Sequence, residues 1–188
     1  MNKYKISSLY IKNFKCVIES EFYFDTNNLV VYDGPNGYGK TTCFEAIEIL
    51  FAKTPRKVRT PFLNRNYAFK NSPIHKENSL EIEISITLED NIGDQIKIKR
   101  IFPPANNYFS RDNNIGKIFD SSTFYINNEQ AEYNDLEQIL DFKNIYTLFN
   151  LLNYVEQDEN TYFLKVNPND RYLTLDSLLG GEEERQLL

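Results

Sequence analysis

A glycine-rich segment at residues 34–42 constrains the fold of this chain more than any other part of its sequence. The segment reads GPNGYGKTT and satisfies the pattern G-x-x-x-x-G-K-[ST]. A short β-branched apolar run at residues 29–32 precedes it and predicts a buried strand. Apolar side chains then recur at helical spacing, at Phe44, Ile47, Leu50 and Phe51. The order strand, glycine-rich loop and amphipathic helix is the setting that this pattern requires.

The spacing of this loop has a physical reason. Glycine tolerates positive φ, which lets backbone N–H groups turn inward around phosphate oxygens, and the loop has Gly34, Gly37 and Gly39. A helix that begins near Lys40 adds unpartnered N–H groups and the positive end of its dipole. Lys40 would neutralise the β- and γ-phosphates of a nucleotide, and the Thr41 hydroxyl would ligate Mg²⁺. We therefore predict ATP and Mg²⁺ as cofactors, bound by Asn36, Gly37, Tyr38, Gly39, Lys40, Thr41 and Thr42. The alternative is a glycine-rich turn that binds nothing.

Hydrolysis needs more than a phosphate loop. A complete site usually adds an apolar strand ending in Asp, which holds Mg²⁺ and positions water. The nearest candidate, ISITLED at residues 84–90, alternates apolar and polar residues and indicates a half-exposed hairpin strand instead. No Asn-Lys-x-Asp motif for guanine is present. The sequence predicts half of an ATP site and no catalytic residue within the chain.

Two further segments carry a family resemblance. IKNFK at residues 11–15 precedes a predicted hairpin and the loop, and FNLLNYVEQ lies at residues 149–157. Together with the loop they resemble the N-terminal lobe of SMC-like ABC-type ATPase heads, a group that includes SMC proteins, RecF and SbcC-type repair ATPases. The resemblance implies that Gln157, in the Q-loop, ligates Mg²⁺ or its water, and that Lys15 lies near the phosphates. A polar residue ending a strand and a solvated surface lysine are the respective alternatives.

The resemblance also implies the fold and its extent. We expect an α/β P-loop NTPase of ABC-ATPase type, with a mixed central sheet and an antiparallel β-hairpin subdomain, present as the N-terminal lobe only. The lobe is expected to span residues 1–180, and residues 181–188 to start a coiled coil at which the chain is truncated. Gly180-Gly181 is similar to the family's signature motif but lacks its serine, so we interpret it as a helix break.

In such ATPases two heads close on ATP, so the resemblance implies a second head as a homodimer partner and a C-terminal lobe of the same or another chain. The expected function is the ATP-binding half of an SMC-like ATPase that handles DNA in repair, chromosome organisation or anti-phage defence, with a nuclease or effector as a further partner. The chain alone is expected to be inactive in ATP hydrolysis. The alternatives are a self-contained P-loop kinase or GTPase and a non-catalytic partner-binding module with a vestigial nucleotide site.

Charge bears on the DNA expectation. The net charge is −6, but residues 1–70 carry 11 basic and 6 acidic side chains (+5), and residues 71–188 carry 10 and 21 (−11). A basic half permits a DNA-facing surface. The resemblance implies that Arg56, Lys57 and Arg59, which follow the helix after the loop, face DNA or the partner nucleotide; a solvated charged loop is the alternative. No apolar run approaches about 18 residues and no signal-peptide pattern is present, which predicts no membrane partner and a cytoplasmic location.

The remaining segments are read from periodicity. Alternation predicts strands at residues 4–11 and 19–24 and a hairpin over residues 80–101. Residues 103–122 are rich in Pro, Asn and Ser and predict a loop, and residues 131–140 predict a short helix. Cys16 and Cys43 are expected to be buried free thiols, and His75 is expected in a polar loop without a catalytic role.

Overall fold

The computed structural model describes residues 4–24, 30, 33–35, 37–51, 72–105, 115–140 and 145. The chain divides into two compact units, residues 1–143 and 144–188, and every described helix and strand lies in the first. Several predictions fall outside the described residues: the strand at 29–32 apart from Val30, the basic segment at 56–59, the Q-loop near 157 and the coiled coil at 181–188.

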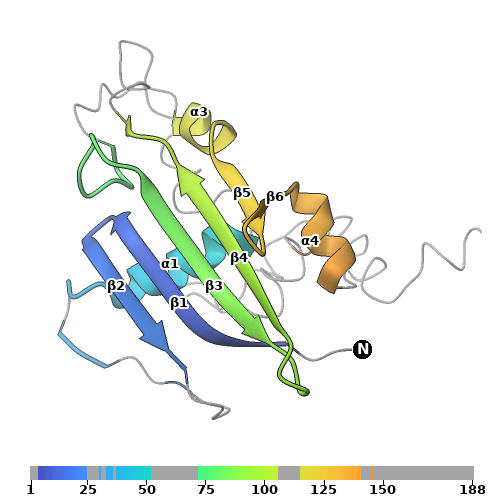
Figure 1. Ribbon diagram of the computed structural model, residues 1–188. Helices are drawn as coiled ribbons and strands as arrows, with labels where there is room; N and C mark the ends of the chain where they lie inside the picture. Colours follow the sequence, from blue (N-terminus) through green and yellow to red (C-terminus); the bar gives the residue numbers. More distant parts are fainter. Residues whose placement is uncertain are drawn as a thin grey trace, which may run out of the picture. The chain divides into compact units, whose positions relative to one another are not determined.

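A six-stranded sheet forms the centre of the described unit (Figure 1). The strand order is β2-β1-β3-β4-β5-β6, and every described pairing is antiparallel. The strands predicted at residues 4–11 and 19–24 are confirmed as β1 and β2, and the hairpin predicted over residues 80–101 is confirmed as β3–β4. The strands are β1 (Lys5–Phe14), β2 (Val17–Tyr23), β3 (Ile82–Glu89), β4 (Gln95–Phe102), β5 (Thr123–Ile126) and β6 (Glu129–Gln130).

The two faces of the sheet follow the period-2 alternation of the strands. One face is apolar: a buried row crosses four strands through the paired residues Leu9, Ile86, Ile98 and Ile126. The helix α1 (Lys40–Phe51) lies against this face and contacts β1, β3 and β4 (Figure 1). The apolar face therefore forms the core, and it fixes the helix that follows the glycine-rich loop.

The helix prediction is confirmed, but the predicted buried face of α1 is wrong in part. Phe44 is 47% exposed, whereas Glu45 and Glu48 are buried together with Ile49 and Leu50. The reason is tertiary, because the turn between β1 and β2 packs on α1 from the side and its Lys15 pairs with Glu45. Helical spacing alone could not show that a lysine would neutralise a carboxylate on this face.

Two short helices flank the β5–β6 edge (Figure 1). The helix predicted at 131–140 is confirmed as α4 (Tyr133–Leu140), which buries Leu136 and Leu140. The loop predicted at 103–122 is wrong in part, because α3 (Ile115–Asp120) lies within it. Phe119 of α3 packs edge-on against Phe102, with ring centroids 5.3 Å apart. This apolar contact anchors a helix that the composition of the segment disguises.

Arg100 interrupts the apolar face of β4. It pairs in register with Ile84 and Phe124 and is 5% exposed. The guanidinium donates to the carbonyl oxygen of Ile49 at 3.0 Å and to that of Phe119 at 3.3 Å. These carbonyls lie in the last turns of α1 and α3, where helices leave acceptors unpaired. Burial lowers the pKa of Arg100 to about 10, which leaves it charged at neutral pH.

Candidate phosphate-binding site

The glycine-rich loop has the backbone geometry that its pattern predicts. Gly34, Gly37 and Gly39 have φ of 151°, 88° and 87°. The Cys43 N–H donates to the Gly39 carbonyl at 3.3 Å as the first bond of α1. The N–H groups of Lys40, Thr41 and Thr42 therefore have no acceptor four residues earlier within the helix. This arrangement of donors at a helix start is a fitting cradle for phosphate oxygens.

The side chain of Lys40 folds back over the loop. Its Nζ donates to the carbonyl oxygens of Gly34 and Pro35, the latter at 3.1 Å. Thr41 is exposed at the start of α1, and Tyr38 is 80% exposed. Asn36 lies outside the described residues. A lysine held by neutral carbonyls can exchange them for phosphate oxygens, which are stronger acceptors because they are charged. The described loop residues thus fit a nucleotide polyphosphate.

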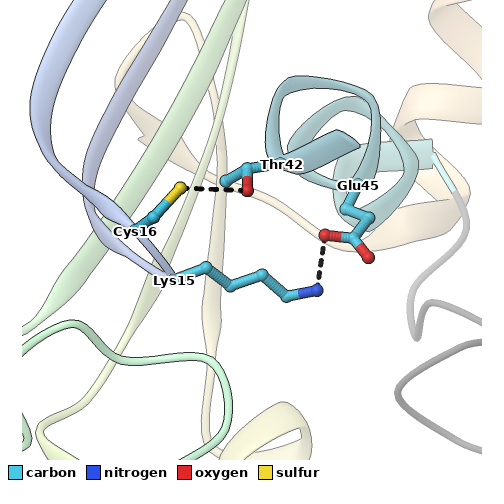
Figure 2. Close-up of polar contacts among 4 residues, drawn as sticks. All are labelled: Lys15, Cys16, Thr42 and Glu45. Atoms are coloured by element: carbon cyan, nitrogen blue, oxygen red, sulfur yellow. Dashed lines mark hydrogen bonds and ion pairs between the residues drawn. The ribbon is translucent and has the colours of Figure 1, made fainter. Parts of the chain in front are cut away.

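A tight turn between β1 and β2 lies against the same end of α1 (Figure 2). Phe14 and Val17 pair across it, which leaves Lys15 and Cys16 at the tip. The Cys16 Sγ lies 3.4 Å from the Thr42 Oγ1. The predicted burial is wrong for Cys16, which is exposed because it occupies the turn, and is confirmed for Cys43, whose thiol pKa is raised by burial.

Lys15 and Glu45 form an ion pair beside the second turn of α1 (Figure 2). Lys15 Nζ donates to Glu45 Oε2, and the exposed fractions of the two side chains are 25% and 6%. The structure thus brings Lys15, which the resemblance nominated, to the helix that follows the loop. Sequence reasoning missed Glu45, since its partner lies 30 residues away in the chain. Its only sequence signal is an acid among apolar residues of the helix.

A second segment, residues 72–80, clamps the end of β1 behind this turn. The Asn13 side chain is 3% exposed and donates to the carbonyls of Glu77 and Leu80, both at 2.9 Å. Its Oδ1 accepts the Glu77 N–H at 2.8 Å, and the Lys15 N–H donates to the Ile74 carbonyl at 2.8 Å. Asn13 and Lys15 have φ of 55° and 51°, so the clamp holds an unusual backbone geometry. These hydrogen bonds therefore fix the backbone of Lys15 at the end of β1.

His75, expected in a polar loop without a catalytic role, is buried in this clamp at 6% exposure. Its Nε2 lies 2.9 Å from the Pro103 carbonyl and its Nδ1 lies 2.7 Å from the Ser72 hydroxyl. A carbonyl can only accept, so Nε2 carries the proton and Nδ1 accepts from Ser72. Burial lowers the pKa of His75 below its ordinary value of 6.5. The residue is a neutral packing element.

The metal site has one described member. Thr41 is the described ligand candidate, and Gln157 lies outside the described residues. Among the residues that the structure describes, no three or more His, Cys, Asp or Glu side chains come together in a way that could hold a metal. A hydroxyl at the helix start together with phosphate oxygens nevertheless suits Mg²⁺, which keeps several waters and takes few protein ligands.

No described helix is both long enough and apolar enough to cross a membrane.

Comparison with known proteins identifies the fold. A comparison with curated proteins finds no match. A chain from a structural study of ATP-driven dimerization and DNA-stimulated activation of SMC ATPases matches at a TM-score of 0.58 and 21% identity, over 92% of this chain and 98% of that one. An Smc head domain with a coiled coil and joint, derived from Pyrococcus yayanosii, matches at a TM-score of 0.61 and 19% identity. That match covers 96% of this chain and 33% of the other, so this chain spans a third of that relative's length.

These likenesses confirm the predicted fold, which is that of SMC head domains. A family model described as an AAA domain matches residues 8–188. The matched region contains the glycine-rich loop, the turn at Lys15 and the clamp that holds it. The chain belongs to this AAA-domain family, AAA_23.

Proposed function

We propose that this chain is the ATP-binding N-terminal half of an SMC-like ATPase. The observation that carries the proposal is the loop at the start of α1, where three glycines have positive φ and the Lys40 ammonium donates to the carbonyls of Gly34 and Pro35. Such a site favours a polyphosphate through oriented N–H groups, the helix dipole and a cation together. Membership of an AAA-domain family and the SMC-type fold favour ATP as the nucleotide.

Each predicted site residue then has a role. Lys40 neutralises the β- and γ-phosphates, Thr41 ligates Mg²⁺ and Gln157 completes the metal's coordination directly or through water. The backbone of Asn36, Gly37, Tyr38 and Gly39, with Thr42 at the helix start, surrounds the phosphates. Lys15 adds a second cation from the β1–β2 turn. Bound Mg²⁺ would supply charge neutralisation between the phosphates.

The parent protein is proposed to handle DNA, with ATP closing two heads and hydrolysis resetting them. The related SMC ATPases of known structure were studied for ATP-driven dimerization and DNA-stimulated activation, which supports a second head as the partner. The proposal includes a C-terminal lobe from the same or another chain, a coiled coil starting at residues 181–188 after a lobe at 1–180, and a cytoplasmic location. Repair, chromosome organisation and anti-phage defence, with a nuclease or effector subunit, remain its candidate settings.

Nucleotide binding by the chain tests the proposal. The melting temperature is measured with and without Mg·ATP and Mg·GTP; a ligand at 100 times its dissociation constant stabilises a protein by about 2.7 kcal/mol. We expect ATP to raise the melting temperature, Lys40→Ala to abolish the rise, and Lys99→Ala on the outer sheet face to leave it intact. Preference for GTP would favour the GTPase alternative. No shift at millimolar nucleotide would favour the vestigial module.

A further inference from the structure

We propose that Glu45 is a positioning residue that holds the Lys15 ammonium at the mouth of the phosphate loop, and that this ion pair stays intact when nucleotide binds. The inference rests on the proposed function, because it assigns a specific role within the same site. It begins from one contact, in which Nζ of a lysine that is 25% exposed donates to Oε2 of a carboxylate that is 6% exposed (Figure 2).

Burial of Glu45 argues that the pair persists. A carboxylate taken out of water needs a partner, and removing the partner of a buried pair is strongly unfavourable. If Lys15 left Glu45 for a phosphate, that carboxylate would stay behind beside the start of α1. An ammonium has three N–H donors, and one carboxylate oxygen occupies a single donor. Lys15 can therefore keep Glu45 and still donate to a phosphate oxygen.

The backbone beneath Lys15 is fixed, so its reach depends on the side chain alone. The Lys15 N–H donates to the Ile74 carbonyl at 2.8 Å, and the neighbouring Cys16 Sγ contacts Thr42 Oγ1 at 3.4 Å. A flexible four-carbon stem has many rotamers, and ordering it on nucleotide binding would cost entropy. Glu45 restricts the stem beforehand and holds the ammonium beside the second turn of α1, while the neighbouring Cys16 contacts the first turn at Thr42.

The pair also cancels a charge that would oppose the nucleotide. Glu45 lies in the second turn of α1, close to the helix start that receives the phosphates. A bare carboxylate there repels a polyphosphate in a partly desolvated site. Lys15 therefore contributes a donor and also neutralises Glu45. As a consequence, the effect of removing the Glu45 charge depends on whether Lys15 is present.

A double-mutant cycle on the full chain tests this dependence, with the dissociation constant of Mg·ATP measured by calorimetry. We expect Glu45→Gln to weaken binding about tenfold, because a neutral amide holds the ammonium less firmly. Lys15→Met is expected to weaken it more. In the Lys15→Met background, Glu45→Gln should leave binding unchanged or improve it, since it then removes only repulsion.

The matched control is Glu48→Gln, the same substitution at a buried position further along the helix, which should leave Mg·ATP binding unchanged. Unfolding without nucleotide is followed for every variant, and Glu45→Asp provides a second test that keeps the charge and shifts the contact. The inference is overturned if wild type binds Mg·ATP and both variants, Glu45→Gln and Glu45→Asp, bind it as tightly as wild type. It is also overturned if Glu45→Gln weakens binding equally with and without Lys15. Failure of wild type to bind is a different result, which refutes the proposed function itself.

Discussion

Gly39 is the residue at which loop geometry and hairpin packing meet. It has φ of 87°, nearly the same as Gly37 at 88°. A Cβ added at Gly39 would lie 2.9 Å from the Cys16 Sγ, whereas a Cβ at Gly37 would meet nothing within 4 Å. The two glycines therefore share one backbone requirement, and Gly39 alone has a packing requirement in addition.

This pair predicts different costs for alanine. Both Gly37→Ala and Gly39→Ala place an alanine in a left-handed backbone conformation, which costs about 1–2 kcal/mol of unfolding free energy. Gly39→Ala also displaces the Cys16 thiol from Thr42, so we expect a larger loss of unfolding free energy in urea and weaker Mg·ATP binding. Adding Cys16→Ala to Gly39→Ala removes the clashing thiol. The double variant should then lose the same unfolding free energy as Gly37→Ala. Equal costs for the two glycines would contradict the packing argument.

The loop residues could be predicted from the sequence because their geometry is local. Spacing and glycine together specify a loop with positive φ at Gly34, Gly37 and Gly39 that leads into a helix. Glu45 could not be predicted in this way, since its role depends on a turn that folding brings from 30 residues away. The apolar character of cysteine predicts a buried Cys16, but the side chain is exposed because the residue lies at the tip of a tight turn.

The lowered pKa of the buried His75 side chain predicts how the stability of the fold depends on pH. Its folded-state pKa lies below 6.5, so the neutral form stabilises the fold above that value and the stabilisation is lost as pH falls. We expect the melting temperature to fall between pH 7.5 and 5.5. His75→Gln, which retains a donor and an acceptor, should flatten this dependence. Since the chain has a single histidine, a slope that persists in the variant would contradict the assignment.

At the scale of elements, Arg100 joins the ends of two helices to the centre of the sheet. Besides the carbonyls of Ile49 and Phe119, it donates to the Ser122 hydroxyl at 2.9 Å. The Cζ atom of its guanidinium also lies 4.8 Å from the centroid of the Phe102 ring. The α1 end that it holds is opposite to the phosphate loop, so it stabilises the helix without touching the site.

Arg100→Met tests this role. Methionine fills much of the volume but leaves buried carbonyl oxygens without their charged donor, which should cost about 3 kcal/mol of unfolding free energy. Arg100→Lys keeps the charge without the planar fork and should be intermediate. The control is Lys99→Met, the neighbouring position on the opposite face, where we expect a change within about 0.5 kcal/mol. Urea unfolding compares them; similar costs at both positions would contradict a capping role for Arg100.

Elements with strong periodicity could be predicted, and those made by pairing could not. The β3–β4 hairpin follows from alternation around the turn that precedes Gln95. In contrast, β5 is only four residues long and is defined by its partner β4, with Ile126 opposite Ile98. The helix α3 sits in a segment whose composition favours loops. Contacts such as Phe119 with Phe102 outweigh that local preference.

At the scale of the whole molecule, the chain corresponds to nearly all of one SMC-type relative and to a third of another. The described residues assemble a phosphate loop, two lysines near it and a helix start. Their candidate metal ligand is a threonine hydroxyl, and they form no cluster of three or more acidic, His or Cys side chains that could hold a metal ion. Phosphate binding and ATP turnover are separable properties, and the described residues fit the first.

The final prediction separates these two properties. The isolated chain should bind Mg·ATP, yet release phosphate no faster than the Lys40→Ala variant. The acidic end of β3 caps its own hairpin turn, where Asp90 Oδ1 accepts the N–H groups of Ile92 and Asp94, so we do not expect it to position an attacking water. Adding a C-terminal lobe that carries a Ser-Gly-Gly signature and an Asp–Glu strand should start turnover, which Lys40→Ala should abolish. Steady-state phosphate release with and without that lobe measures the effect. Turnover by residues 1–188 alone that depends on Lys40 would show a self-contained enzyme, and the half-site interpretation would then be wrong.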